Sequence, residues 1–216
     1  MYNFFLILIV FHFSFGYESL DFEFLKKAQS NKASSKTIDK SSSKNKSFEK
    51  IIEGYVKKEG LFTYYWNEDK NKCFLAIHKN QLNKAFLLNI TRNMGDAYRY
   101  HGSAMGPRFT FSFKKVGANI QIIQENLKFR AEKDSAIFRA INNNISNSIF
   151  STAKIESEKD SILLVDASAL FIFDFSKIAN SGKYVLDKKN SYFNKIKSFM
   201  LNSELDMSLH YKGKKT

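Results

Sequence analysis

From Phe109 to Phe113 every second residue is a phenylalanine, and hydroxyl residues stand between the rings. This period of two places all three rings on one face of an extended strand, and that face has to be buried. Gly117-Ala118 then offers a two-residue turn of type II′, which needs glycine at its first position. Asn119 to Gln124 is the expected partner strand. The chain is therefore predicted to contain an antiparallel hairpin with one buried face.

Other short apolar runs predict further strands of the same sheet. The sequence has 22 Phe, 10 Tyr and a single Pro, a composition that favours strands over helices. We expect the fold class to be α+β, with a predominantly antiparallel β-sheet and one or two covering helices. Polar turns between the first three runs predict an antiparallel meander. The runs span residues 61–66, 73–78, 85–91, 161–166, 169–173, 192–200 and 204–211.

Two segments have helical rather than alternating periodicity. From Phe48 to Val56 apolar residues recur at helical spacing, which predicts an amphipathic helix that stops at Gly60. From Asp134 to Phe150 an isoleucine recurs every fourth residue, with Asp134 as the expected N-cap. The three consecutive asparagines at positions 142–144 are poor helix formers, so this second helix is expected to be short or broken.

The chain begins with an apolar run, from Phe4 to Phe15, that is too short to cross a membrane as a helix. It has the length of the apolar part of a signal peptide, and Ser14 and Gly16 are small residues at the positions that a signal peptidase recognises. We therefore expect residues 1–16 to be a signal peptide cleaved after Gly16. The protein would then be exported, periplasmic or extracellular, with no membrane span after cleavage. No Lys or Arg precedes the run, so an uncleaved anchor or a different start remains an alternative.

Basic charge is concentrated after this run. The formal net charge is +13, and eight lysines against two acidic residues lie between Lys26 and Lys50. Residues 17–47, rich in Ser and Lys, are expected to be a disordered linker, because they hold too little apolar surface to offset the entropy of ordering. The expected domain spans residues 48–211, and residues 212–216 form a basic tail. Nucleic acid is a disfavoured partner, because the remaining charge is spread widely.

The candidate reactive side chains do not form a recognisable catalytic set. Cys73 lies in an apolar run, where a small buried hydrophobe is a better interpretation than a nucleophile. The four histidines, at positions 12, 78, 101 and 210, are isolated, and none has the spacing of a zinc site. Asp166 and Asp174 flank the most apolar run, and we interpret them as caps of backbone amides rather than as acid and base.

The loop from His101 to Arg108 contains Gly102 and Gly106 and resembles an anion-binding loop. It lacks the Gly-Lys-Ser/Thr ending of a phosphate-binding loop. Tyr98 to His101 interleaves aromatic rings with a cation, a pattern that can stack bases or sugars, and we interpret it as a solvated loop beside the sheet. The sequence thus predicts no catalytic, cofactor-binding or metal-binding residue in this chain.

A series of short motifs follows the order found in one protein family. The motifs are Gly60-Leu-Phe-Thr63, Phe74-Leu-Ala-Ile77, Lys84-Ala-Phe-Leu-Leu88, Arg108-Phe109, Phe129-Arg-Ala131, Ala136-Ile-Phe-Arg-Ala140, Asn147-Ser-Ile-Phe150, Leu164-Val-Asp-Ala-Ser-Ala-Leu-Phe171 with Asp174, and Tyr184-Val-Leu-Asp187 with Ser191. In this order the chain resembles the N-terminal domain, which has no assigned function, of exported bacterial zinc-dependent metalloproteases. The resemblance runs from about Phe48 to about Tyr211 and rests on the shared order of the motifs.

The resemblance implies an accessory domain. In that family the zinc is held by a His-Glu-x-x-His helix in a later catalytic domain, and this chain has no such motif. No catalytic residue is carried over, no cofactor is expected in this chain, and the expected partner is a metalloprotease catalytic domain. A truncated or split gene and a free-standing accessory domain both fit. The first is favoured, because the chain stops just after a predicted strand.

We therefore expect a non-catalytic N-terminal accessory domain that assists folding, inhibition or substrate access of a separate catalytic part, and we expect no proteolysis by this chain alone. Two alternatives remain open. One is a free-standing exported protein that recognises an anionic polymer through a Lys-rich surface. The other is a hydrolase whose site the motifs do not show.

Overall fold

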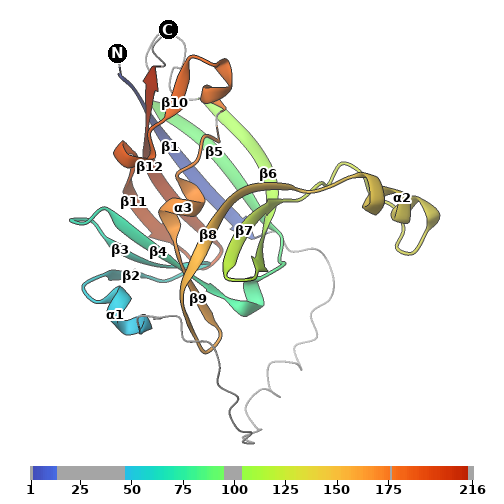
Figure 1. Cartoon of the computed structure of the whole chain (residues 1–216), viewed down its shortest axis with the longest axis horizontal. Helices are drawn as coiled ribbons and strands as arrows, with labels where there is room; N and C mark the ends of the chain where they lie inside the picture. Colours follow the sequence, from blue (N-terminus) through green and yellow to red (C-terminus); the bar gives the residue numbers. More distant parts are fainter. Residues whose placement is uncertain (1, 14–46, 95–103, 176, 214–216) are drawn as a thin grey trace, which may run out of the picture.

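The computed structural model describes residues 2–13, 47–94, 104–175 and 177–213 of the chain. The strands are β1 (Tyr2–Phe13), β2 (Val56–Lys58), β3 (Thr63–Asn67), β4 (Lys72–His78), β5 (Phe86–Met94), β6 (Ala104–Val116), β7 (Asn119–Gln124), β8 (Ser148–Lys159), β9 (Ile162–Asp166), β10 (Tyr184–Leu186), β11 (Tyr192–Ser198) and β12 (Asn202–Gly213). They form one curled sheet in the order β10-β12-β1-β5-β6-β7-β8-β9-β4-β3-β2, with β11 also beside β12 (Figure 1). Every strand pairing in this sheet is antiparallel.

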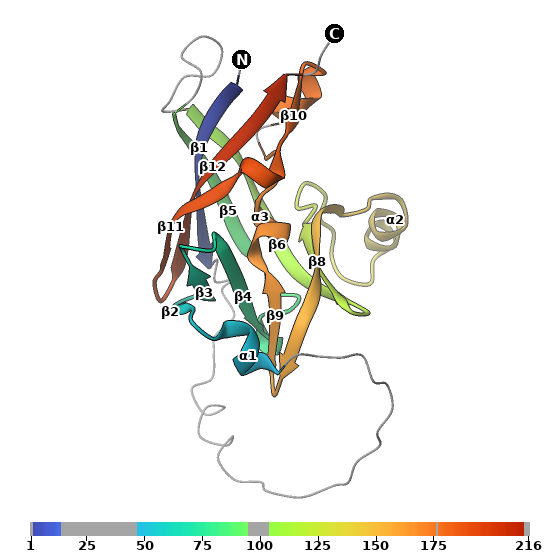
Figure 2. The same cartoon turned by 60° about the vertical axis from the view of Figure 1, so that its left-hand side comes forward.

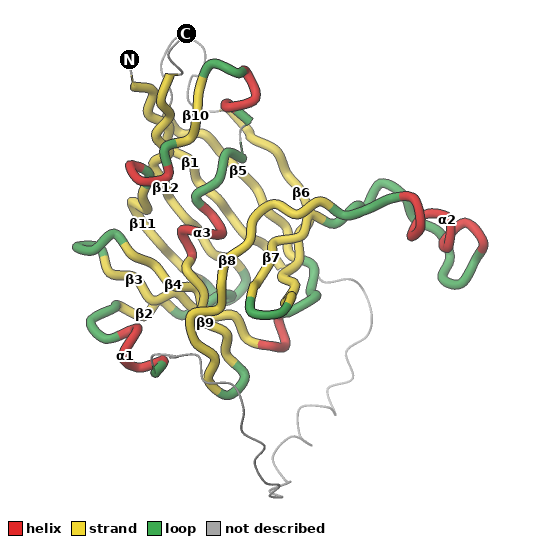
Figure 3. The backbone as a smooth tube through the Cα atoms, in the orientation of Figure 1, coloured by secondary structure: helices red, strands yellow, loops and turns green. Residues whose placement is uncertain are grey.

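Helices make up little of the described chain (Figure 3). They are α1 (Phe48–Ile52), α2 (Ala136–Asn144) and α3 (Ala167–Phe171), with short 3-10 turns η2 (Lys79–Gln81), η3 (Ile178–Ser181) and η4 (Lys188–Asn190). The predicted α+β class, with a predominantly antiparallel sheet, is confirmed.

The predicted hairpin is confirmed and supplies the centre of the core. β6 and β7 pair from Phe111 with Gln124 to Val116 with Asn119. The turn places Gly117 at a φ of 56°, the positive value that its first position requires. The rings of Phe62, Phe86, Phe111 and Phe113 contact one another with centroids 4.9–5.9 Å apart, and all four are fully buried. Burial of aromatic rings of this size is the main source of stability for the inner face.

Two helices cover the sheet, one on each face. On the outer face α1 packs Phe48 against Tyr65 in an edge-to-face contact, in a small cluster with Ala76 and Leu164. On the inner face α3 lies beside β8 and β4, where Leu170 and other residues of α3 join the main core (Figure 2).

The predicted strand over residues 169–173 is wrong, because this segment begins with α3. Its N-cap is Asp166, whose carboxylate accepts a hydrogen bond of 2.7 Å from the backbone amide of Ser168. The sequence Ala167-Ser-Ala-Leu-Phe171 is rich in good helix formers, so the capped turn closes here. An apolar run alone does not separate a buried strand from a buried helix.

Both predicted helices end earlier than the periodicity indicates. The first stops at Ile52, because Val56–Lys58 pairs with β3 as the edge strand β2. The second is confined to Ala136–Asn144, since residues 148–154 pair with β7. Its N-cap is Ser135, which accepts a hydrogen bond of 3.0 Å from the amide of Phe138, and not Asp134 as predicted.

The predicted meander is correct for β3 and β4 but wrong for β5. β4 takes β9 as its other neighbour, from Phe74 opposite Asp166 to His78 opposite Ile162, whereas β5 lies between β1 and β6. β8 and β10 were not predicted. β8 is mainly polar, with Ala153 and Ser157 as its fully buried residues, so it lacks the apolar run that marks the other strands.

The apolar start of the chain forms β1, the strand between β12 and β5. A signal peptide that is removed would not be part of the folded sheet. Cleavage of residues 1–16 stays a prediction. Most of the predicted linker and the segment Tyr98–His101 lie outside the described residues. The basic tail begins inside β12, which extends to Gly213. No helix in the described ranges is long and apolar enough to span a bilayer.

The two ends of the sheet meet at Gly60. Next to it, the amide of Leu61 donates to the carbonyl of Phe199 at 2.6 Å, and the hydroxyl of Ser198 donates to the carbonyl of Phe62 at 2.6 Å. A Cβ at Gly60 would lie 2.6 Å from the backbone N and O of Phe199. The contact that closes the sheet therefore requires glycine.

Gly60→Ala is expected to lower the free energy of unfolding by about 1–3 kcal/mol, because the Phe199 backbone has to move away. Thermal and urea unfolding of the full chain measure it. Gly213→Ala is the matched control, since a Cβ at Gly213 meets nothing within 4 Å. Equal destabilisation by the two substitutions would contradict a specific contact at Gly60.

Candidate binding site

A long connection between β7 and β8 projects from the sheet and carries α2 at its far end (Figure 1). We call residues 125–147 the arm. Its helix is amphipathic, but none of its residues is fully buried, and Ile137 is 67% exposed. Phe129 in the outgoing part is 53% exposed. The arm therefore holds large apolar side chains that the rest of the described chain does not cover.

A hollow of about 870 Å³ lies between the arm and the outer face of the sheet. Phe138, Ile141 and Ile145 of the arm line one side of it, and Ile123 and Ile149 line the sheet side. Its polar lining includes the cations Lys114 and Arg130. Such a mixture of apolar walls and a few charged groups is typical of a ligand-binding pocket.

Glu125 and Asn147 join the two stems of the arm. The Glu125 carboxylate accepts hydrogen bonds from the Ser112 hydroxyl and, at 3.0 Å, from the Asn147 amide. The side-chain carbonyl of Asn147 accepts from the backbone amide of Asn126 at 2.8 Å. The base of the arm is thus fixed to β6 and to itself, so the hollow has defined walls.

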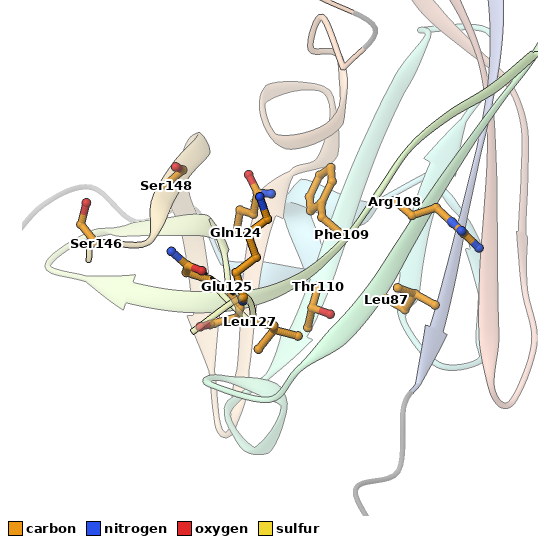
Figure 4. Close-up of a pocket in the computed structure, with 11 residues that line it drawn as sticks. Leu87, Arg108, Phe109, Thr110, Gln124, Glu125, Leu127, Ser146 and Ser148 are labelled. Atoms are coloured by element: carbon orange, nitrogen blue, oxygen red, sulfur yellow. Dashed lines mark hydrogen bonds between the residues drawn. The ribbon is translucent and has the colours of Figure 1, made fainter. Parts of the chain in front are cut away.

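A second recess, of about 700 Å³, opens on the other side of the arm's base (Figure 4). Phe109 forms its apolar wall and stacks on Phe150 with centroids 4.4 Å apart. Arg108 and Gln124 supply polar groups at its border, and Leu127, 46% exposed, lies at the arm side. The two recesses share Glu125, Asn126 and Ser146, so the arm's base stands between them.

The two carboxylates singled out from the sequence bind backbone amides, as predicted. Asp166 caps α3. Asp174 accepts from the amides of Ile178 and Ala179 at 3.0 and 2.7 Å, and from the hydroxyl of Tyr211 at 2.7 Å. These bonds fix the chain around η3, so the structure gives both acids a structural role.

The other candidate groups lie far apart in the fold. Cys73 is buried on β4, and burial raises the pKa of its thiol well above the ordinary value, so the interpretation as a small buried hydrophobe is confirmed. His78 ends β4, and His210 lies in β12. His12 is in β1, and His101 lies outside the described residues. In the described ranges, no three His, Cys, Asp or Glu side chains are arranged to hold a metal ion.

A charged cluster pins the segment after β10 to β12. The Asp187 carboxylate, 9% exposed, binds the Lys212 ammonium at 2.5 Å and the Asn190 amide at 2.6 Å, and it lies 3.4 Å from His210 Nδ1. The hydrogen bond from Lys212, with that from Asn190, holds the pKa of the Asp187 carboxyl well below its usual range. The Ser191 hydroxyl donates to the Asp187 carbonyl and accepts from the His210 amide. Both of these hydrogen bonds are with the backbone.

A family model described as "Domain of unknown function (DUF5117)" matches residues 102–216, more than half of the chain. The chain belongs to the DUF5117 family. No curated protein and no solved structure shows significant similarity to it. The arm and all strands from β6 onward lie inside the DUF5117 match. The DUF5117 strand β9 pairs with β4, so the matched part and residues before it share one sheet.

Part of this site was predictable from the sequence. The stripe of Ile137, Ile141 and Ile145 marks an amphipathic helix, but nothing in it indicates that the helix leaves the sheet. No sequence pattern indicated that Glu125 and Asn147 would bind each other, and they meet because the arm returns to its starting point.

Asn147→Ala removes hydrogen bonds to Glu125 and to Asn126, so opening of the arm should become easier by about 1–3 kcal/mol. Hydrogen exchange of the amides at 136–144 measures this change and should speed up while the midpoint of global unfolding moves little. Glu132→Gln, in the exposed outgoing part of the arm, is the control. Unchanged exchange in Asn147→Ala would show that these bonds do not hold the arm.

Asp187→Asn should destabilise the chain at neutral pH. The carboxyl's pKa is depressed on folding, so its contribution is present above the unfolded value of about 3.9 and is lost as the pH falls below it. The difference in unfolding free energy between the two proteins should be constant above about pH 5 and shrink towards pH 3. Asp69→Asn, in an exposed turn, is the control. If the difference in unfolding free energy does not depend on pH, the ion pairs of Asp187 are not its cause.

Proposed function

We propose that this chain is a non-catalytic accessory domain of an exported zinc metalloprotease, and that its arm docks on the separate catalytic part. Docking would assist the folding, inhibition or substrate access of that part. The proposal joins the order of sequence motifs, which resembles the N-terminal domain of such proteases, with the exposed apolar residues of the arm.

The observation that carries the proposal is the clustering of exposed apolar side chains in one short stretch of chain. Leu127, Phe129, Ile137 and Ile149 are each 46–67% exposed and all belong to the arm or its stems. Single exposed apolar residues are common on protein surfaces, whereas a group of them marks an interaction site. Aromatic side chains such as Phe129 are enriched in protein interfaces, where a few central residues contribute most of the affinity.

The polar base of the arm supports the same function. Because Glu125 and Asn147 fix both stems, the arm presents its apolar residues without a large loss of conformational freedom on binding. A partner side chain that enters the hollow would contact Phe138 and Ile141.

A second candidate function is recognition of an anionic polymer. Lys114 and Arg130 both line the hollow, and the carboxylate of Glu125, which also lines it, is bound to Ser112 and Asn147. Affinity of this kind falls steeply with added salt, because it depends on released counterions.

The test begins with the DNA that follows the codon for Thr216, read in all frames for a chain with a His-Glu-x-x-His helix. That chain is co-expressed with this one, and the complex is measured by calorimetry at physiological salt. Ile137→Asp should weaken the complex at least tenfold, since a charge enters an apolar contact. Val185→Asp, 47% exposed on β10, is the matched control and should bind as the unaltered chain does.

Equal affinity of Ile137→Asp and the unaltered chain would show that the arm does not dock. Absence of a complex would refute the accessory role. Affinity for polyphosphate that disappears between low and moderate salt, without a complex, would instead favour the second candidate function.

A further inference from the structure

β1 connects two parts of the sheet that do not otherwise pair. It is antiparallel to β12 from Tyr2 opposite Lys212 to His12 opposite Asn202, and antiparallel to β5 from Leu6 opposite Met94 to Phe13 opposite Phe86. In the strand order of the described chain, β5 and β12 contact each other only through β1. Figures 1 and 2 both show it lying between them. The space between β5 and β12 is therefore a slot one strand wide.

The register of this slot favours a strand with apolar residues at alternate positions. On β12, the buried Leu205, Met207 and Leu209 lie opposite positions 9, 7 and 5 of β1. On β5, the buried Ile90 and Leu88 lie opposite positions 9 and 11. Directly opposite residues share one face of a sheet, so position 9 meets a buried apolar residue on both walls, positions 5 and 7 meet one on β12, and position 11 meets one on β5.

The intervening positions have no such requirement. Positions 8 and 10 of β1 lie opposite Asp206 and Glu204 of β12, and opposite Thr91 and Asn89 of β5. These flanking residues are polar, so the slot selects through one set of alternate positions only. An extended peptide with apolar residues at every second position satisfies it.

β1 is also not joined to either neighbour by a short turn. Residues 14–46 separate it from α1, and its two partner strands come much later in the chain. The place of a strand on a long connection is not fixed by a tight turn, so an equivalent strand can replace it. Without an occupant, β5 and β12 would each expose an unpaired row of amide and carbonyl groups, which another strand readily satisfies.

We propose that the slot between β5 and β12 is a binding site for an extended, alternately apolar peptide, and that residues 2–13 occupy it as an intramolecular ligand. Main-chain hydrogen bonds to both walls provide affinity, and the two apolar rows select the sequence. The site is independent of the arm and lies apart from the proposed docking surface.

Disulfide formation in the full chain tests whether residues 2–13 of the same chain occupy the slot. Val10→Cys with Glu204→Cys should oxidise to a bond within one chain, because the two positions are opposite each other. Leu6→Cys with Glu204→Cys is the control, about 13 Å out of register along the strand. The native Cys73 is buried and does not compete. Failure of the first pair, or a covalent dimer from it, would overturn the intramolecular assignment.

Peptide binding is tested with a full-length variant that carries a specific protease site in place of residues 28–34. After cleavage, the first fragment should stay bound through gel filtration and be displaced by a fluorescent peptide of residues 2–13 with added lysines for solubility. The same peptide with Ile7→Pro and Ile9→Pro should bind at least tenfold more weakly, because proline removes two ladder donors. Two outcomes would refute the site. One is that the first fragment dissociates and the peptide of residues 2–13 does not bind. The other is that this peptide and its proline variant bind equally well.

Discussion

The structure depends on one constraint: a single sheet with one apolar face has to bury that face against itself. The rings of Phe62, Phe86, Phe111 and Phe113 pack across the inside of the curl, and α3 fills space beside them. Curling brings the two ends of the sheet together, and they meet where Leu61 bonds to Phe199. Since no side chain fits at Gly60, this closure and the ring cluster are parts of the same arrangement.

Residues outside this closure are not constrained by the packing of the core. The arm leaves the sheet between β7 and β8 and is held at its base by Glu125 and Asn147, not by the core. Its exposed apolar side chains are therefore available for the proposed docking without loss of packing inside.

The strongest local patterns were predictable, and long-range pairings were not. The alternation around Phe111 gave the hairpin, because one buried face forces a period of two. The same rule could not place residues 169–173, where the carboxylate of Asp166 starts a helix. It also missed β8, which has few apolar residues although it lies between β7 and β9. The base of the arm carried no signal, since Glu125 and Asn147 are brought together by the path of the chain. The pairing of the first strand with the last has a similar origin.

That pairing sets the order in which the molecule can be completed. β1 is made first, yet its partner β12 is made last. At about 5–20 residues per second, a ribosome takes roughly 10–40 seconds to synthesise what lies between them. During that interval this apolar stretch can pair with β5, but its other edge has no partner. A chaperone that recognises apolar segments therefore has time to bind it before β12 is made.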